Sequence, residues 1–87
     1  MYLHLGQDTI VKKENIIGIF DMDTSTVSKL TRNFLNFAEK QGRVINVSYE
    51  LPKSYVICSE NGRLTVYISQ LSSTTLESRA EKGFMEY

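Results

Sequence analysis

The pair Asn61-Gly62, between two runs of alternating apolar residues, constrains the fold more than any other feature of the chain. Asn-Gly is the preferred pair for a two-residue type I′ turn, because both central residues need a positive φ. Centring the turn there sets Glu60 opposite Arg63. One face of the hairpin is then apolar and contains Tyr55, Ile57, Leu64, Val66 and Ile68. The second face carries both apolar and polar side chains, and we expect it to be covered by a helix or a neighbouring subunit, or to stay partly exposed to solvent.

The segment 25–41 has helical instead of strand-like periodicity. Its apolar stripe comprises Val27, Leu30, Phe34, Phe37 and Ala38. The opposite face is polar and carries Lys29, Arg32, Asn33, Asn36, Glu39 and Lys40. Asp23 or Thr24 is placed to cap the start, and Gly42 to end the helix in a left-handed conformation. These features predict one long amphipathic helix.

Shorter apolar segments complete a small mixed or antiparallel sheet. Residues 2–5 and 9–12 read as strands around a turn in which Gly6 supplies a positive φ or a bulge. The β-branched run 16–20 predicts a strand that is buried on both faces or packed at a subunit boundary. Residues 43–49 alternate as a half-buried strand does, and Pro52 marks a connection after them. The sequence therefore predicts an α+β fold.

The run 71–80 is rich in hydroxyl side chains and follows the hairpin. Thr74 and Glu77 have the spacing of a capping box, in which a hydroxyl and a carboxylate satisfy the first amides of a helix. A phosphate cradle normally adds glycines and a lysine, which this run lacks. We interpret it as the start of a short C-terminal helix.

Composition excludes several classes of function. Ten basic and ten acidic side chains give a formal net charge of zero, so binding to nucleic acid requires charges segregated onto one face. Cys58 is the single cysteine, so the chain has no internal disulfide and no thiolate cluster for a metal. His4 is the single histidine. Asp21 and Asp23 fit helix capping better than cation binding. We expect no enzyme, no metal and no cofactor.

Length and hydropathy predict one small cytoplasmic domain. No apolar run approaches the ~20 residues of a membrane span, and residues 1–5 lack the features of a signal peptide. We expect a single domain over residues 1–80 and a flexible tail over 81–87. The apolar tail residues either fray or dock on a partner; they are Phe84, Met85 and Tyr87.

Several short motifs, taken in order, resemble the Rem family of bacterial extracellular matrix regulatory proteins. These motifs are Leu5-Gly6, Ile10-Val11, the run 16–20, Pro52-Lys53-Ser54 and the run 69–76. The resemblance covers nearly the whole chain up to Ala80 and is closest to RemB-type members. It implies a small α+β fold that assembles into homo-oligomeric rings. It also implies binding to double-stranded DNA that promotes transcription of biofilm matrix operons.

The resemblance also indicates which residues contact DNA. In RemA-type members, binding depends on an arginine that corresponds here to Asn15 and on an arginine pair that corresponds to Leu51 and Pro52. None of these three residues is basic. Nearby lysines can contact phosphates as point charges, without the forked geometry of arginine. Our candidate nucleic-acid-binding residues are Lys12, Lys13, Asn15 and Lys53, and we expect weak, salt-dependent contacts with the DNA backbone.

Two functions remain open at this point. The first is a cytoplasmic, non-enzymatic DNA-binding transcriptional regulator of biofilm matrix genes that acts as a homo-oligomer. The second is an oligomeric structural or protein-interaction module that has lost direct DNA binding, which the zero net charge and the missing arginines favour. Both predict self-assembly, and neither involves a membrane.

Overall fold

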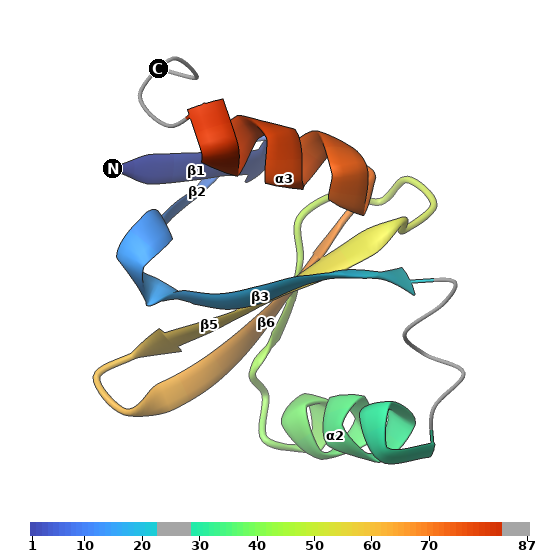
Figure 1. Cartoon of the computed structure of the whole chain (residues 1–87). Helices are drawn as coiled ribbons and strands as arrows, with labels where there is room; N and C mark the ends of the chain where they lie inside the picture. Colours follow the sequence, from blue (N-terminus) through green and yellow to red (C-terminus); the bar gives the residue numbers. More distant parts are fainter. Residues whose placement is uncertain (23–28, 83–87) are drawn as a thin grey trace.

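A computed structural model describes residues 1–22 and 29–82 of the chain (Figure 1). A two-stranded antiparallel sheet comprises β1 (Tyr2–Gly6) and β2 (Thr9–Lys12). A four-stranded sheet comprises, in spatial order, β3 (Ile16–Asp21), β5 (Ser54–Glu60), β6 (Arg63–Ser69) and β4 (Val44–Asn46). The remaining elements are the 3-10 turn η1 (Lys13–Asn15) and the helices α2 (Lys29–Lys40) and α3 (Ser73–Lys82).

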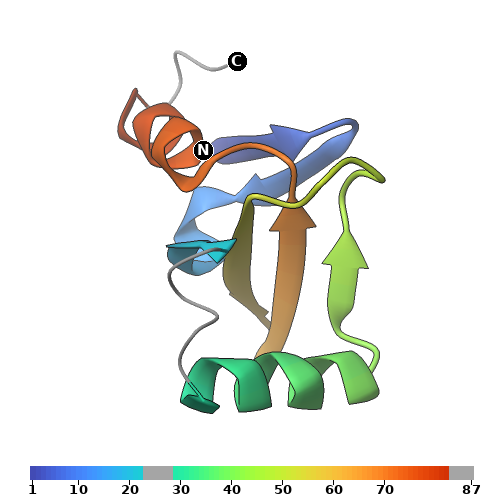
Figure 2. The ribbon, with the colours of Figure 1, turned by 90° about the vertical axis from the view of Figure 1, so that its right-hand side faces the viewer.

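The four-stranded sheet lies between two layers. Helix α2 lies on one side, while the β1–β2 hairpin and α3 lie on the other (Figure 2). On the α2 side Tyr55 and Val66 are buried against Ala38. On the opposite side Leu3, Leu5 and Leu76 are fully buried against Val56 and Cys58. The α+β class is confirmed, and the mixed hairpin face is covered by the N-terminal hairpin and α3, an arrangement that the sequence did not predict.

The β5–β6 hairpin has the predicted register. Glu60 pairs with Arg63, Ile57 with Val66 and Tyr55 with Ile68. The φ angles of Asn61 and Gly62 are 52° and 79°, as a type I′ turn requires. Gly6 has a φ of 118°, and the β1–β2 register shifts between His4 and Gly6, so a positive φ and a bulge both occur there.

The outer strands differ from expectation. Ile17 on β3 is 60% exposed, so burial of the strand on both faces is wrong for this residue, whereas packing at a subunit boundary stays a prediction. The reason is that β3 is an edge strand and its register with β5 shifts between Ile16 and Gly18. Strand β4 ends at Asn46 instead of residue 49. The Val47 amide still donates to the Ile68 carbonyl at 2.9 Å, after which the chain leaves the sheet.

Helix α2 packs through the predicted stripe at Phe34 and Ala38, but Leu35 takes the place of Phe37. Phe34, Leu35 and Ala38 contact the sheet, whereas Phe37 is 60% exposed. Ala38 is central to the buried stripe, and Phe37 lies 100° away from it around a helix of 3.6 residues per turn. The predicted start of the helix falls outside the described residues, as do Asp23, Thr24 and Val27. The other end is confirmed: Gly42 has a φ of 70°, and Arg43 N donates to Ala38 O at 3.0 Å, as in a Schellman motif.

Helix α3 begins earlier than the capping-box spacing predicted. Ser72 is the cap, because its Oγ accepts from the Thr75 amide at 3.1 Å, and Thr74 lies inside the first turn. The sequence offered two candidate caps, because the hydroxyl of Ser72, two positions before Thr74, has the same capping ability. The structural interpretation of the hydroxyl run is otherwise supported. The helix continues to Lys82, and residues 83–87, with Phe84, Met85 and Tyr87, lie outside the described residues.

Candidate nucleic-acid interface

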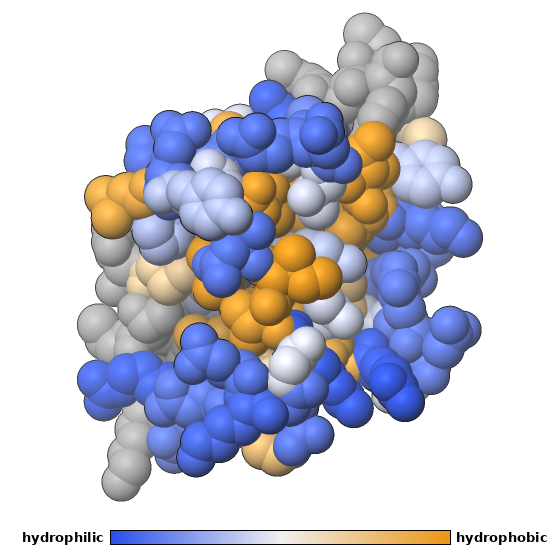
Figure 3. All heavy atoms as spheres, turned by 180° about the vertical axis from the view of Figure 1, so that it is seen from behind, coloured by the Kyte–Doolittle hydropathy of each residue, from blue (hydrophilic) through white to orange (hydrophobic). Residues whose placement is uncertain are grey.

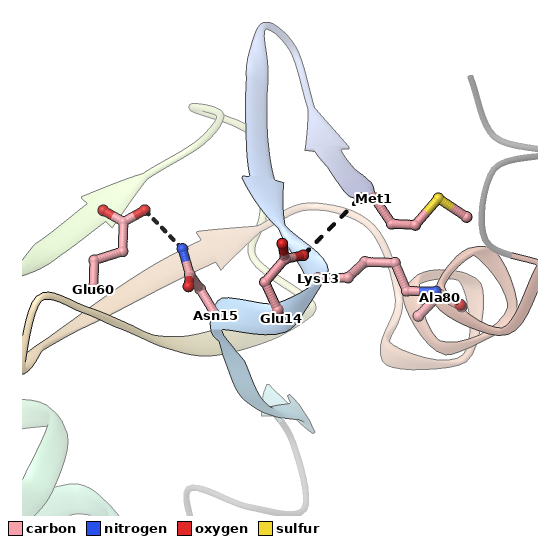
Figure 4. A network of polar contacts seen from close by, with 6 residues as sticks. All are labelled: Met1, Lys13, Glu14, Asn15, Glu60 and Ala80. Atoms are coloured by element: carbon pink, nitrogen blue, oxygen red, sulfur yellow. Dashed lines mark hydrogen bonds and ion pairs between the residues drawn. The ribbon is translucent and has the colours of Figure 1, made fainter.

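Two of the predicted site residues, Lys12 and Asn15, lie together beside the β5–β6 turn. Strand β2 ends at Lys12, and η1 leads from it into β3, whose first residues pair with the far end of β5. This path brings Asn15 next to Glu60, and Asn15 Nδ2 donates to Glu60 Oε1 at 3.3 Å (Figure 4). Together with Asn61 these side chains line an open polar hollow.

The hollow combines both signs of charge. Lys12 and Glu60 are both exposed, and Arg63 pairs in register with Glu60 across the turn. The amides of Asn15 and Asn61 add hydrogen-bond donors at the same place. A phosphate can therefore approach Lys12 and the two amides, provided that it stays clear of the Glu60 carboxylate.

Lys13 points away from this hollow and contacts the C-terminal part of α3. Its Nζ reaches the Ala80 carbonyl and donates to it (Figure 4). Its backbone amide donates to the Met1 carbonyl at 3.0 Å. The Met1 amine lies 4.0 Å from the Glu14 carboxylate. A lysine on the last carbonyls of a helix stabilises both the unpaired oxygens and the helix dipole. Lys13 thus connects the N-terminal hairpin to α3, and this role accounts for its half-buried side chain.

Lys53 lies at the opposite end of β5. Its amide donates to the Ser69 carbonyl at 2.9 Å, and its carbonyl accepts from the Met22 amide at 3.0 Å, while the side chain is exposed. A strand rises about 3.3 Å per residue, so the length of β5 separates Lys53 from the hollow by about 20 Å. One copy of the chain therefore brings together Lys12 and Asn15, but neither Lys13 nor Lys53 with them.

Sequence reasoning missed two residues of the hollow, Glu60 and Asn61. The turn at Asn61-Gly62 was assigned correctly, but the β3–β5 pairing that places η1 beside it is a long-range contact. The sequence assigned Arg32 and Lys40 only to the polar face of a helix, together with the exposed acid Glu39. Helix α2 exposes Arg32 and Lys40 on the face that points away from the sheet.

The described residues show little other site chemistry. Burial, and secondarily the charge of Glu60, raise the pKa of Cys58 to about 11, so its thiol is a weak nucleophile at neutral pH. Burial also raises the pKa of Tyr67. Over residues 1–22 and 29–82 there is no group of three or more potential metal ligands. Neither of the described helices has the length and apolar character needed to cross a membrane.

Comparison with known proteins decides the family. Residues 2–80 match the RemA-like family, described as extracellular matrix regulatory protein A-like. This chain belongs to that family. The RemA-like chain is also 37% identical over 84 residues to the extracellular matrix regulatory protein B of Bacillus subtilis (strain 168). The aligned residues cover 97% of this chain and 95% of the relative. The resemblance to a RemB-type member, inferred from short motifs, is confirmed.

Proposed function

We propose that this protein is a non-enzymatic regulator of extracellular matrix genes that binds double-stranded DNA as a homo-oligomer. The observation that carries the proposal is the match over nearly the full chain to a protein named as an extracellular matrix regulator. The structure supports it with Lys12 and two amide side chains at the rim of an open polar hollow. This RemA-like chain has no arginine at the three positions discussed above, so contacts with phosphates fall to lysines and amides.

Assembly is central to this mechanism. Each neutralised phosphate contributes about 0.9 to the slope of log affinity against log salt. Lys12 and Lys53 together supply about two contacts per subunit, and going from 50 to 200 mM salt then weakens binding only roughly tenfold. An assembly that engages six or more phosphates loses roughly a thousandfold or more over the same range. Many weak sites on one particle thus give useful affinity that a single copy lacks.

A titration of labelled duplex DNA at 50 and 200 mM salt tests the proposal. We expect binding at the lower salt, a steep salt dependence, and a marked loss of affinity in Lys12→Glu and Lys53→Glu. The matched control is Lys40→Glu, which makes the same charge change on exposed α2. Loss of binding in the control alone would move the interface to α2. Absence of binding at 50 mM by a folded, oligomeric protein would refute DNA binding.

A second function is supported by a separate observation. The segment that follows β4 exposes two large side chains, Tyr49 at 107% and Leu51 at 80%. Exposed apolar groups of this size are common at protein-protein contacts. An oligomeric protein-interaction module is therefore the alternative. It predicts that the double variant Tyr49→Ser, Leu51→Ser folds like wild type and no longer captures a protein partner. It also predicts that neither wild type nor the double variant binds duplex DNA.

A further inference from the structure

The four-stranded sheet has two open edges. Strand β3 lies at one margin and β4 at the other, and no described strand pairs with the outer side of either (Figure 2). Each edge carries an exposed isoleucine: Ile17 is 60% exposed on β3, and Ile45 is 43% exposed on β4. An edge strand presents unpaired amides and carbonyls, which are a template for pairing with another strand.

The directions of the two edge strands match. Strands β3 and β6 are both antiparallel to β5, and β4 is parallel to β6, so β3 and β4 run the same way. The register places Ile45 level with Ile19 through Tyr67 and Val56. A second copy displaced sideways, without being turned over, therefore brings its β3 alongside β4 of the first copy as a parallel neighbour.

Charges at the ends of these strands fit the same arrangement. At the start of β4 stands Arg43, and before the start of β3 stands Glu14, whose side chain is 66% exposed and lies 4.0 Å from the Met1 amine of its own chain. At the other end, exposed Glu50 follows β4, and exposed Lys53 lies beside the end of β3 through its bond with Met22. In a parallel pairing, Arg43 of one copy lies at the same end as Glu14 of the next, and Glu50 lies at the same end as Lys53. Asp21, which ends β3, has a partner within its own chain.

We propose that copies of this chain join edge to edge, with β4 of one copy against β3 of the next. The proposal rests on the self-assembly in the proposed function and locates its interface. Strand β4 lies on the side away from β3 (Figure 2), and the view from behind in Figure 3 shows an apolar patch surrounded by hydrophilic side chains. Such a contact uses two different surfaces, so it repeats from copy to copy and either closes into a ring or extends as a filament. Strand β4 has only three residues, so side chains contribute much of the contact.

Charge reversal provides the test, with oligomeric mass from light scattering as the readout. Arg43→Glu and Glu14→Arg each place like charges together, and we expect each to need at least about tenfold more protein to assemble. The double variant restores the pair and should assemble like wild type. The control is Arg32→Glu, on the exposed face of α2 and away from both edges. Circular dichroism checks folding, and Ile17→Lys is a second disrupting variant whose exposed position spares the core.

Three outcomes separate the claims. Dissociation by both single changes, with recovery in the double variant, supports the edge-to-edge interface. An oligomer that neither the charge reversals nor Ile17→Lys affects overturns this interface and leaves self-assembly in place. A wild-type monomer at every concentration overturns both the interface and the oligomeric part of the proposed function, while DNA titration still tests the remainder.

Discussion

Ser69 is the hydroxyl with the largest expected structural effect. Its side chain is fully buried, and its Oγ donates to the Leu5 carbonyl and accepts from the Leu71 amide at 2.7 and 3.0 Å. Ser69→Ala removes the hydroxyl partner of two backbone groups, and a buried group left unsatisfied costs about 1–3 kcal/mol. Because Leu71 is only half-buried, we expect a total loss of about 2–4 kcal/mol in the free energy of unfolding. For a chain of 87 residues, stability is about 4–13 kcal/mol, so the loss is a large fraction.

Thermal and urea unfolding, followed by circular dichroism, measure the effect. The expected loss lowers the melting temperature by roughly 10–25 °C in a domain of this size. Ser54 makes one such bond, from its Oγ to the Leu71 carbonyl at 2.7 Å, so Ser54→Ala should cost about half as much. Exposed Thr74 makes neither contact, and Thr74→Ala is the control. If Ser69→Ala costs no more than Thr74→Ala, the structural interpretation of these hydroxyls is refuted.

Three further predictions concern stability. Ser72→Ala removes the α3 cap and should cost about 1 kcal/mol in urea unfolding, whereas no change would show that another group caps α3. Gly42→Ala should cost about 1 kcal/mol and Gly42→Asn less, because the φ of 70° favours glycine and then asparagine; equal effects would contradict this. Burial raises the pKa of Cys58 from 9.0 to about 11, so the folded state keeps a proton that the unfolded chain loses. The free energy of unfolding should therefore be constant below pH 9 and fall by about 2–3 kcal/mol by pH 11. If it falls as steeply between about pH 9 and 10 in Cys58→Ala as in wild type, the assignment to Cys58 is contradicted.

Local signals explain what the sequence could predict. The Asn61-Gly62 turn and Gly42 need a positive φ, and the structure has it at each position. Hydrophobic alternation then determined the pairs across the hairpin. The partner of the mixed hairpin face could not be predicted in the same way. Its cover consists of β1, β2 and α3, which meet only through contacts between the two ends of the chain.

The candidate site shows the same limit. Sequence proximity grouped Lys12 with Lys13, but the turn of η1 sends one to the hollow and the other to the Ala80 carbonyl. Neighbouring residues in an extended segment point in opposite directions, so adjacency along the chain does not imply a shared surface. Lys53 was grouped by family position, and the length of β5 separates it from the other candidates. If Lys12 and Lys53 contact the same duplex, as the proposed function has it, the contacts are about 20 Å apart on one copy of the chain.

The mass of the particle with and without duplex DNA tests the central claim most directly. Light scattering at about 50 mM salt should find an oligomer whose mass rises by that of the bound DNA, and raising the salt to about 200 mM should release the DNA while the oligomer persists. A mass that duplex DNA leaves unchanged at the lower salt would contradict the account.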